Sequence, residues 1–300
     1  MKLQPIRSQK DLNDIFDIND QKIISLIKLK NKYKKRSIPK KSGGIRVITE
    51  PAPELKSFQK KLGSYIFRMK KLKFAYGGVK NKCREDVAKL HRCNYFILKC
   101  DIKNCFPSIR KKVVVKELLN FGFTYKYAKL FTEIITFEGS LPQGAPSSPG
   151  MANLILDKID NQIITVLPFG CKYSRWIDDI MISFPKKNQL KIIKDISKKI
   201  ENIIHSNGLN LKDGVSIILK EHCSDLLGQS ISKKINIPKK WYKILRSQVY
   251  RLKRGFYKGK EQEKIIALIK GKMVLLKSVT VHHKKQTRYY TLKKILDKIM

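Results

Sequence analysis

The stretch YSRWIDDIMIS, from Tyr173 to Ser183, places two adjacent carboxylates beside an apolar run. Asp178 and Asp179 directly precede residues 180–182, whose side chains are typical of a buried strand. Burying such an acidic pair is costly unless a positive group neutralises it. One interpretation is a turn at the end of a strand, where Asp is common. The other is a functional site, and the rest of the sequence has to decide between them.

The chain as a whole is strongly basic, which makes an acidic pair unusual. Its 300 residues include 65 Lys and Arg against 24 Asp and Glu, a formal net charge of +41. The hydrophobic fraction, 42%, is ordinary for a globular protein. A surface with this charge favours a polyanionic partner, and nucleic acid is the main candidate. An anionic membrane is the competing partner, but no stretch forms an isolated basic amphipathic helix.

The sequence gives no sign of secretion, membrane insertion or a transition-metal site. The N-terminus lacks an apolar signal segment, and no uninterrupted apolar run approaches membrane-spanning length. The six cysteines form no Cys-x-x-Cys pair and no Cys/His cluster with zinc spacing. We therefore expect reduced thiols in a cytoplasmic protein that does not bind a membrane.

Apolar periodicity and turn residues predict an α+β fold with helices on one face of a sheet. Residues 39–51 predict a β-hairpin with a Ser-Gly-Gly turn. Residues 95–98 are a buried-strand signal that delivers Asp101 at the strand's end, and residues 171–185 predict a hairpin with the Asp pair at its turn. Helices are predicted within residues 10–34 and at 54–71, 111–123, 125–137, 151–164 and 189–209, and short strands near 215–237.

The three carboxylates at these strand ends suggest metal-assisted phosphoryl transfer. Asp101, Asp178 and Asp179 would repel one another on adjacent strands unless divalent metal bridged them. Two Mg²⁺ ions about 3.5–4 Å apart meet that need, because hard oxygen ligands suit Mg²⁺. One ion would lower the pKa of an attacking hydroxyl, and the other would stabilise charge on the leaving pyrophosphate.

From about residue 233 the chain becomes more basic and carries interleaved aromatic residues. This composition predicts a mostly helical lobe that follows a phosphate backbone. The alternative is a helical bundle with a solvated basic face.

Ordered motifs over nearly the whole length resemble those of reverse transcriptases, most closely the bacterial retron and group II intron-like branch. IPKKSGGIRVITEPAPELKSFQK, residues 38–60, is similar to the family's fingers motif, and ILKCDIKNCFPSI, residues 97–109, to motif A. LPQGAPSSPGMANLILDKID, residues 141–160, is similar to motif B and is the most specific match. YSRWIDD occupies the place of the YxDD motif C, and DLLGQSI, residues 225–231, lies where such enzymes grip the primer.

The resemblance implies a right-hand polymerase architecture with an antiparallel-sheet palm. Residues 1–95 would form the N-terminal helices and fingers, with part of the palm. Residues 96–235 would form the palm with interleaved fingers elements, and residues 236–300 a basic helical thumb.

The resemblance also implies roles for single residues. The catalytic carboxylates would be Asp101, Asp178 and Asp179, which with the carbonyl of Ile102 would hold two Mg²⁺ ions. Phe106 would be the sugar-facing aromatic that excludes a 2′-OH, although it could also be a plain core aromatic. The other residues implied to bind the incoming nucleotide are Arg46, Lys41, Gln143 and Gly144. Those implied to bind the primer or other nucleic acid are Trp176, Leu227, Gly228 and His91.

Several positions depart from the family pattern. Trp176 replaces the Tyr of motif C, keeping a flat face but losing the hydroxyl, and Ile177 stands where a small residue is usual. Val87 replaces the Asn of the retron Asn-Ala-x-x-His motif. The lysine that the family places after motif C, which would act as a general acid toward pyrophosphate, aligns with Val215, and Lys212 could substitute for it.

We therefore predict an RNA-directed DNA polymerase, and more specifically a retron enzyme of the bacterial cytoplasm. Its partners would be a structured non-coding RNA as template and primer, the RNA–DNA hybrid, dNTPs and an effector protein. The product would be multicopy single-stranded DNA made in antiphage defence. The alternatives are another class of defence-associated reverse transcriptase, a catalytically impaired RNA-binding member of the same fold, and a generic basic RNA-binding protein.

Overall fold

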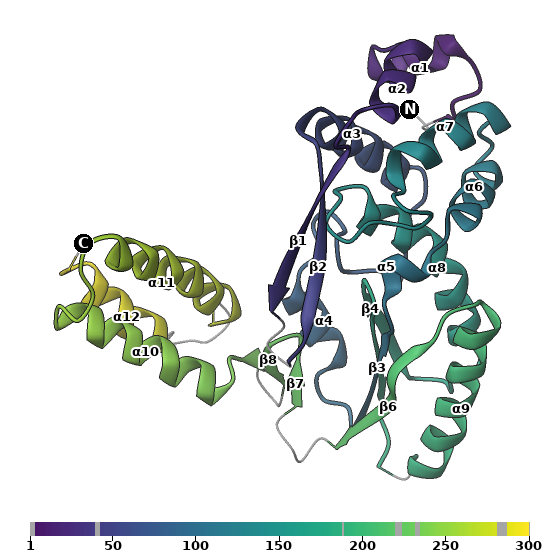
Figure 1. The fold of residues 1–300 in the computed structure, drawn as a ribbon. Coiled ribbons are helices and arrows are strands. Elements are labelled where there is room, and N and C mark those ends of the chain that lie inside the picture. The colour runs from purple at the N-terminus through teal and green to yellow at the C-terminus, as the bar shows by residue number, and fades with distance from the viewer. Residues whose placement is uncertain are drawn as a thin grey trace. The chain divides into compact units, whose positions relative to one another are not determined.

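The computed structural model describes residues 4–39, 43–187, 189–219, 224–231, 235–280 and 287–299 (Figure 1). Helices and strands are mixed along the chain, and the predicted α+β class is confirmed. The helices are α1 (Gln9–Phe16), α2 (Asp20–Ile27), α3 (Pro53–Arg68), α4 (Arg84–His91), α5 (Cys105–Ser108), α6 (Lys111–Asn120), α7 (Tyr125–Ile135), α8 (Ser148–Thr165), α9 (Leu190–Ser206), α10 (Lys239–Lys253), α11 (Gly259–Thr280) and α12 (Thr287–Leu296). The strands are β1 (Tyr33–Pro39), β2 (Ile45–Pro51), β3 (Phe96–Ile102), β4 (Lys172–Trp176), β5 (Asp179–Phe184), β6 (Leu211–Leu219), β7 (Ser224–Leu226), β8 (Gln229–Ile231) and β9 (Ile235–Asn236).

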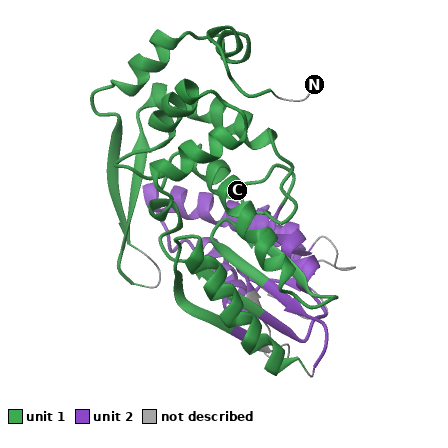
Figure 2. Cartoon of the chain, turned by 90° about the vertical axis from the view of Figure 1, so that its right-hand side faces the viewer, with its two compact units in different colours: residues 1–82, 98–181, 189–216 green, residues 83–97, 182–188, 217–300 purple. Residues whose placement is uncertain are grey.

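The chain divides into two compact units, which Figure 2 colours separately. Unit 1 comprises residues 1–82, 98–181 and 189–216, and unit 2 comprises residues 83–97, 182–188 and 217–300. The division into fingers, palm and thumb at residues 1–95, 96–235 and 236–300 stays a prediction.

The N-terminal part of unit 1 forms as local sequence signals predict. Ser8 and Asn19 cap α1 and α2, because their side chains accept from backbone N–H groups of Asp11 and Lys22 at 3.1 and 2.9 Å. β1 and β2 pair antiparallel as one long hairpin (Figure 1). Its Gly43 has a φ of 85°, a left-handed conformation that glycine adopts without strain.

A four-stranded sheet in the order β4-β5-β3-β6 brings together strands from distant parts of the chain. β3 and β5 are neighbours at its centre, and almost every residue of both is buried. A two-residue turn, Ile177-Asp178, joins β4 to β5. α8 and α9 lie beside the sheet (Figure 1). This topology places the C-terminal end of β3, which carries Asp101, next to the turn that carries Asp178.

Unit 2 contains α4, a small sheet in the order β7-β8-β9, and the helices α10, α11 and α12. The three helices pack on one another through buried apolar side chains, including Leu245, Val249, Ile269, Leu276 and Leu292. The predicted helical character of the C-terminal lobe is confirmed.

Of the helices within the described ranges, none has both the length and the apolar character needed to cross a membrane.

Candidate active site

A cavity of about 850 Å³ in unit 1 gathers segments that are far apart in the sequence. Its wall is built by the end of β1, the start of β2, the end of β3 with α5, the loop before α8, the β4–β5 turn and the start of β6. The predicted site residues on this wall are Arg46, Asp101, Ile102, Phe106, Gln143 and Asp178.

Asp101 and Asp178 reach this cavity because their strands are neighbours. The backbone N–H of Ile102 donates to the carbonyl of Asp178 at 3.1 Å, which joins the end of β3 to the β4–β5 turn. Burial raises the pKa of both carboxyl groups, and the negative charge of Asp101 raises the pKa of Asp178 further. The cavity therefore holds two partly desolvated carboxylates at an electrostatic cost to the protein.

Two positively charged side chains on the cavity wall offset part of this electrostatic cost. Lys212, at the start of β6, is the largest influence lowering the pKa of Asp101, and Arg46 lowers the pKa of both aspartates. Among the described residues, neither aspartate has a Lys, Arg or His nitrogen within the 4.0 Å of an ion pair. Their oxygens therefore stay open to another cation.

The donor set of the cavity fits a divalent metal ion. Two carboxylates and the nearby carbonyl of Ile102 are hard oxygen donors of the kind that Mg²⁺ prefers. Within the described ranges, no group of three or more His, Cys, Asp or Glu side chains is arranged to hold a metal ion. The fit therefore rests on two aspartates, to which substrate phosphates and water would have to add ligands.

The third predicted carboxylate, Asp179, is not among the described residues that line the cavity. It is the first residue of β5, and its charge contributes to the raised pKa of the Cys100 thiol, about 12, behind burial and the charges of Asp101 and Glu201. The structure thus brings two of the three predicted carboxylates together at the cavity.

Phe106 reaches the cavity through a sharp turn after β3. Asn104 has a φ of 48°, in the left-handed region that Asn tolerates better than most residues. The N–H of Lys103 donates to the carbonyl of Asn210 at 2.8 Å, which holds this turn against the segment before β6. Phe106 then lies in α5, half-buried on the same wall as Asp101.

Gln143 and Gly144 are both predicted to bind the incoming nucleotide, but the structure gives them different surroundings. Gln143 lines the cavity, and its carbonyl accepts from the N–H of Thr49 in β2 at 2.7 Å. Gly144, with a φ of 123°, packs against β2 instead: a Cβ there would lie 2.7 Å from Ile48 Cγ2 and 3.0 Å from the Thr49 carbonyl oxygen. The glycine lets the loop before α8 contact the hairpin. Lys41 lies outside the described residues.

The predicted primer-binding residues occupy three different settings. Trp176 ends β4 and is half-buried. Leu227 and Gly228 form the β7–β8 turn in unit 2, with φ values of 53° and 80°. His91 is only 1% exposed, and its Nδ1 lies 2.9 Å from the Ser183 hydroxyl. This burial gives His91 a packing role, while the primer contacts of all four residues stay predictions.

Sequence reasoning missed one buried residue beside the site, Arg175. Its side chain is fully buried, bonds to Asp160 on α8, and donates to the carbonyl of Ile177 in the β4–β5 turn. The only signal available was a charged residue inside a strand with apolar neighbours, and that signal is weak in so basic a chain.

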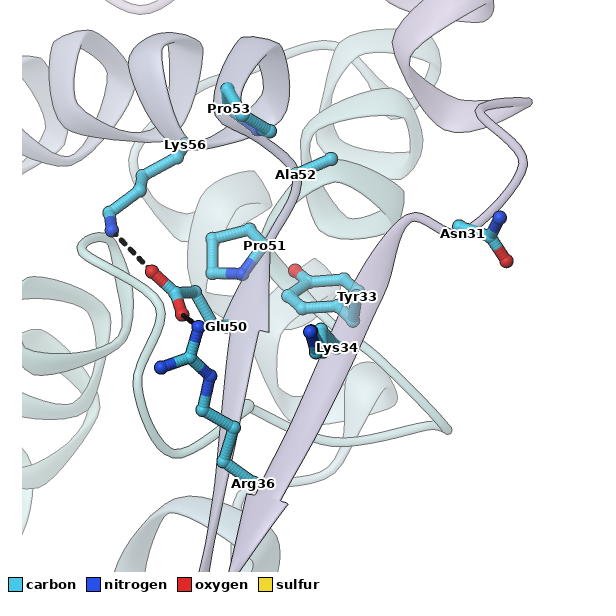
Figure 3. A pocket seen from close by; sticks show the side chains of 9 residues that line it. All are labelled: Asn31, Tyr33, Lys34, Arg36, Glu50, Pro51, Ala52, Pro53 and Lys56. Atoms are coloured by element: carbon cyan, nitrogen blue, oxygen red, sulfur yellow. Dashed lines mark hydrogen bonds and ion pairs between the residues drawn. The ribbon is translucent and has the colours of Figure 1, made fainter.

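A second cavity in unit 1, of about 680 Å³, lies at the base of the β1–β2 hairpin (Figure 3). Its carboxylate, Glu50, already pairs with Lys56 at 2.8 Å and Arg36 at 3.6 Å (Figure 3). None of the predicted site residues lines it. The first cavity is therefore the candidate active site.

An α+β fold with two carboxylates from adjacent strands, flanked by arginine and lysine, defines a site suited to phosphorylated ligands and divalent cations. The family model described as reverse transcriptase (RNA-dependent DNA polymerase) matches residues 38–231, so the chain belongs to the reverse transcriptase family. The predicted enzyme class, an RNA-directed DNA polymerase, and the resemblance to retron enzymes are confirmed.

Curated relatives include three retron reverse transcriptases. Retron Ec86 reverse transcriptase of Escherichia coli is 28% identical over 239 residues, 78% of this chain and 72% of that protein. Retron Mx162 reverse transcriptase of Myxococcus xanthus is 28% identical, over 60% of this chain and 42% of that protein. Retron Ec73 reverse transcriptase of Escherichia coli is 31% identical, over 55% of this chain and 58% of that protein.

Solved structures similar to this chain include telomerases. Telomerase from Candida albicans, in complex with a fragment of telomeric RNA, has 12% identity and a TM-score of 0.48, covering 87% of this chain and 55% of that one. Apo telomerase from Candida tropicalis has 13% identity and a TM-score of 0.49, covering 89% of this chain and 60% of that one.

Proposed function

We propose that this chain copies a structured RNA into DNA. In this reaction a 3′-hydroxyl, or a 2′-hydroxyl of the RNA at priming, attacks the α-phosphate of a dNTP and pyrophosphate leaves. The observation that carries the proposal is the delivery of Asp101 and Asp178 by neighbouring strands into one cavity that Arg46 also lines. Membership of the reverse transcriptase family supports the same reaction.

The proposed metal-binding residues are Asp101 and Asp178, with the carbonyl of Ile102 and with Asp179 as a further carboxylate. When bound, Mg²⁺ ions would activate the attacking hydroxyl and neutralise charge on the leaving pyrophosphate. The raised pKa values of the two cavity aspartates support this role. They mean that the ionised carboxylates are destabilised by burial and, at Asp178, by the charge of Asp101, and a bound cation would remove this destabilisation.

The incoming dNTP would lie between the hairpin and α5. Arg46 is exposed on the hairpin and offers a planar fork that matches phosphate oxygens, while Lys41 would add a point charge. Phe106 would close the space beside the sugar and so disfavour a 2′-OH. Lys212 also lines the cavity. It would give a proton to the leaving pyrophosphate or neutralise its charge, the role that the family's lysine after motif C would have.

The resemblance to retron enzymes supports a finer proposal for the biological role. We infer that the chain makes multicopy single-stranded DNA from a cognate non-coding RNA in the bacterial cytoplasm, with an effector protein, in defence against phage. Fingers at residues 1–95, a palm at 96–235 and a thumb at 236–300 would hold the RNA–DNA hybrid, with the basic helices of residues 236–300 following its backbone. Another class of defence-associated reverse transcriptase is the alternative, as is a catalytically impaired RNA-binding member.

Asparagine substitutions at the two aspartates test the proposed reaction. Asp101→Asn and Asp178→Asn keep side-chain size and remove charge, so each should abolish dNTP incorporation on an RNA template while RNA binding remains. Asp195→Asn, an exposed carboxylate on α9, is the matched control and should keep full activity. Incorporation that survives either cavity substitution would contradict the proposed site. An unmutated chain that binds RNA but incorporates no dNTP would favour the impaired member.

Sequencing the nucleic acid that copurifies with the protein tests the retron role. A covalent RNA–DNA hybrid with a single RNA species is the expected result. DNA without such a branch would contradict retron priming and favour another class of defence-associated enzyme.

A further inference from the structure

The turn that carries Asp178 has an unfavourable backbone conformation. Ile177 has a φ of 57°, and a β-branched residue in the left-handed region is a true outlier that costs about 1–2 kcal/mol. Such strain persists only where the surroundings fix the backbone, and it is concentrated at functional sites. The contacts around Ile177 should therefore show what fixes this turn.

Arg175 is the group that holds the turn from inside unit 1. Its Nη1 donates to the Ile177 carbonyl at 2.8 Å and to Asn153 Oδ1 at 2.7 Å. Nε and Nη2 donate to the two carboxylate oxygens of Asp160, each at 2.7 Å, and Nη2 also donates to the Asn153 carbonyl at 3.3 Å. These bonds engage every donor of a guanidinium that is fully buried.

The same network also connects the turn to Gly77 through Asn153. Asn153 Nδ2 donates to the carbonyl of Gly77 at 2.8 Å. A Cβ on Gly77 would lie 2.8 Å from the Ile177 backbone nitrogen and 2.9 Å from its Cγ1, so this segment touches the turn directly. The strained residue is thus held by a hydrogen bond from Arg175 and by close packing against the backbone of Gly77.

We propose that Arg175 is a positioning residue that, through the Ile177 carbonyl, sets where Asp178 enters the cavity. This inference rests on the proposed function, because it assigns Asp178 a role in the reaction. Pairing with Asp160 alone would compensate the buried charge, and a lysine could make that pair. Bonding Asp160 and the Ile177 carbonyl at the same time needs several nitrogen donors held in one plane. Arginine has these in its guanidinium, whereas lysine has a single nitrogen.

Two conservative variants separate positioning from general stability. Arg175→Lys keeps the charge beside Asp160 but cannot reach Asp160, Asn153 and the Ile177 carbonyl together. Tyr173→Phe is the matched control: it removes the 2.6 Å bond from the Tyr173 hydroxyl to Asp160 in the same buried network and leaves every Arg175 donor in place. Thermal unfolding of both proteins would confirm that each is folded before it is assayed.

The first measurement is Mn²⁺ binding by the free protein, followed from the loss of the free-ion EPR signal. Disturbing a residue that orients metal ligands typically weakens metal binding by about 10- to 100-fold. We expect a loss of that size in Arg175→Lys and none in Tyr173→Phe. The second measurement is dTTP incorporation on poly(rA)·oligo(dT), where Arg175→Lys should lower kcat by about 10- to 100-fold with primer–template affinity unchanged.

Gly77→Ala provides a second route to the same effect without touching the arginine. The added methyl group would push on the turn at Ile177, so Mn²⁺ binding and kcat should fall as they do in Arg175→Lys. This variant decides the question if Arg175→Lys does not fold.

Each outcome tests one of the two proposals. Equal losses in Arg175→Lys and Tyr173→Phe, or unchanged Mn²⁺ binding in both Arg175→Lys and Gly77→Ala, would overturn the positioning role. If the unmutated protein binds Mn²⁺ but incorporates no dTTP, the proposed function fails while the EPR comparison still decides the role of Arg175. An unmutated protein that does not bind Mn²⁺ would leave no site to position and would overturn the inference.

Discussion

Acidification should destabilise unit 2 through a single buried histidine. His91 is 1% exposed at the C-terminal end of α4, and its ring contacts the Ser183 hydroxyl. Burial lowers its pKa from 6.5 to about 4, because the interior disfavours the imidazolium. The unfolded chain therefore takes up a proton at a pH where the folded chain does not.

The sign and size of the effect follow from this difference. Because the folded pKa is depressed, the contribution to stability is complete above about pH 6.5 and is lost as the pH falls toward 4. In this interval the free energy of unfolding decreases by about 1.4 kcal/mol per pH unit. Between about pH 7.5 and about pH 5 the total loss from His91 is about 2 kcal/mol.

The assay is urea unfolding followed by tryptophan fluorescence in a Trp176→Phe background. The chain has two tryptophans, so this background leaves Trp241, on α10 of unit 2, as the reporter. His91→Gln removes the titrating ring. The fall in the free energy of unfolding between the two pH values should then be about 2 kcal/mol smaller in this variant than in the Trp176→Phe background. His205→Gln, an exposed position on α9 in unit 1, is the control and should leave the pH dependence unchanged.

A particular result would refute the reasoning. If His91→Gln unfolds with the same pH dependence as the background, the loss of stability arises elsewhere and His91 does not titrate as a buried group. A lower stability of His91→Gln at every pH is compatible with the reasoning, because the substitution also disturbs packing.

Three further substitutions test the site. Gly144→Ala should displace the loop before α8 and lower dNTP incorporation. Its methyl group would clash with Ile48, and the positive φ would cost about 1–3 kcal/mol. Normal activity together with a normal melting temperature would contradict this contact. Asp160→Asn should lower the free energy of unfolding by about 3–5 kcal/mol, because it leaves the buried Arg175 without its carboxylate partner. A decrease below about 1 kcal/mol, measured by urea unfolding, would contradict the pairing. Phe106→Ala should raise rNTP incorporation relative to dNTP incorporation in primer extension, and an unchanged ratio would argue against a sugar gate.

Local signals were enough to predict the elements that carry the site. The Ser-Gly-Gly turn indicated the β1–β2 hairpin, and apolar runs indicated β3 and β5. These signals succeed because turn chemistry and side-chain alternation act over a few residues. The first arm of the hairpin is longer than predicted and begins at Tyr33, because its pairing with Pro51 is a tertiary contact.

Contacts between distant segments limited the prediction of the site. Nothing near Gly144 in the sequence shows that β2 packs against it, so its predicted contact with the incoming nucleotide rests on the motif alone. Arg175 is a similar case, since its partner Asp160 lies 15 residues earlier on a different element. A buried arginine can be recognised only together with the carboxylate that neutralises it.

The distribution of carboxylates explains how so basic a chain can keep a cation site open. Asp160 is fully buried and is neutralised by Arg175 at 2.7 Å, and the nearly buried Asp157 pairs with Lys70 at the same distance. Within the described residues, the cavity aspartates have no such partner, although Arg46 is near enough to lower the pKa of both. A lysine or arginine in direct contact would compete with a metal ion for the same oxygens. With Arg46 on the hairpin, outside ion-pair distance, the carboxylates would be free to hold the proposed metal ion and the guanidinium would be free to bind a phosphate.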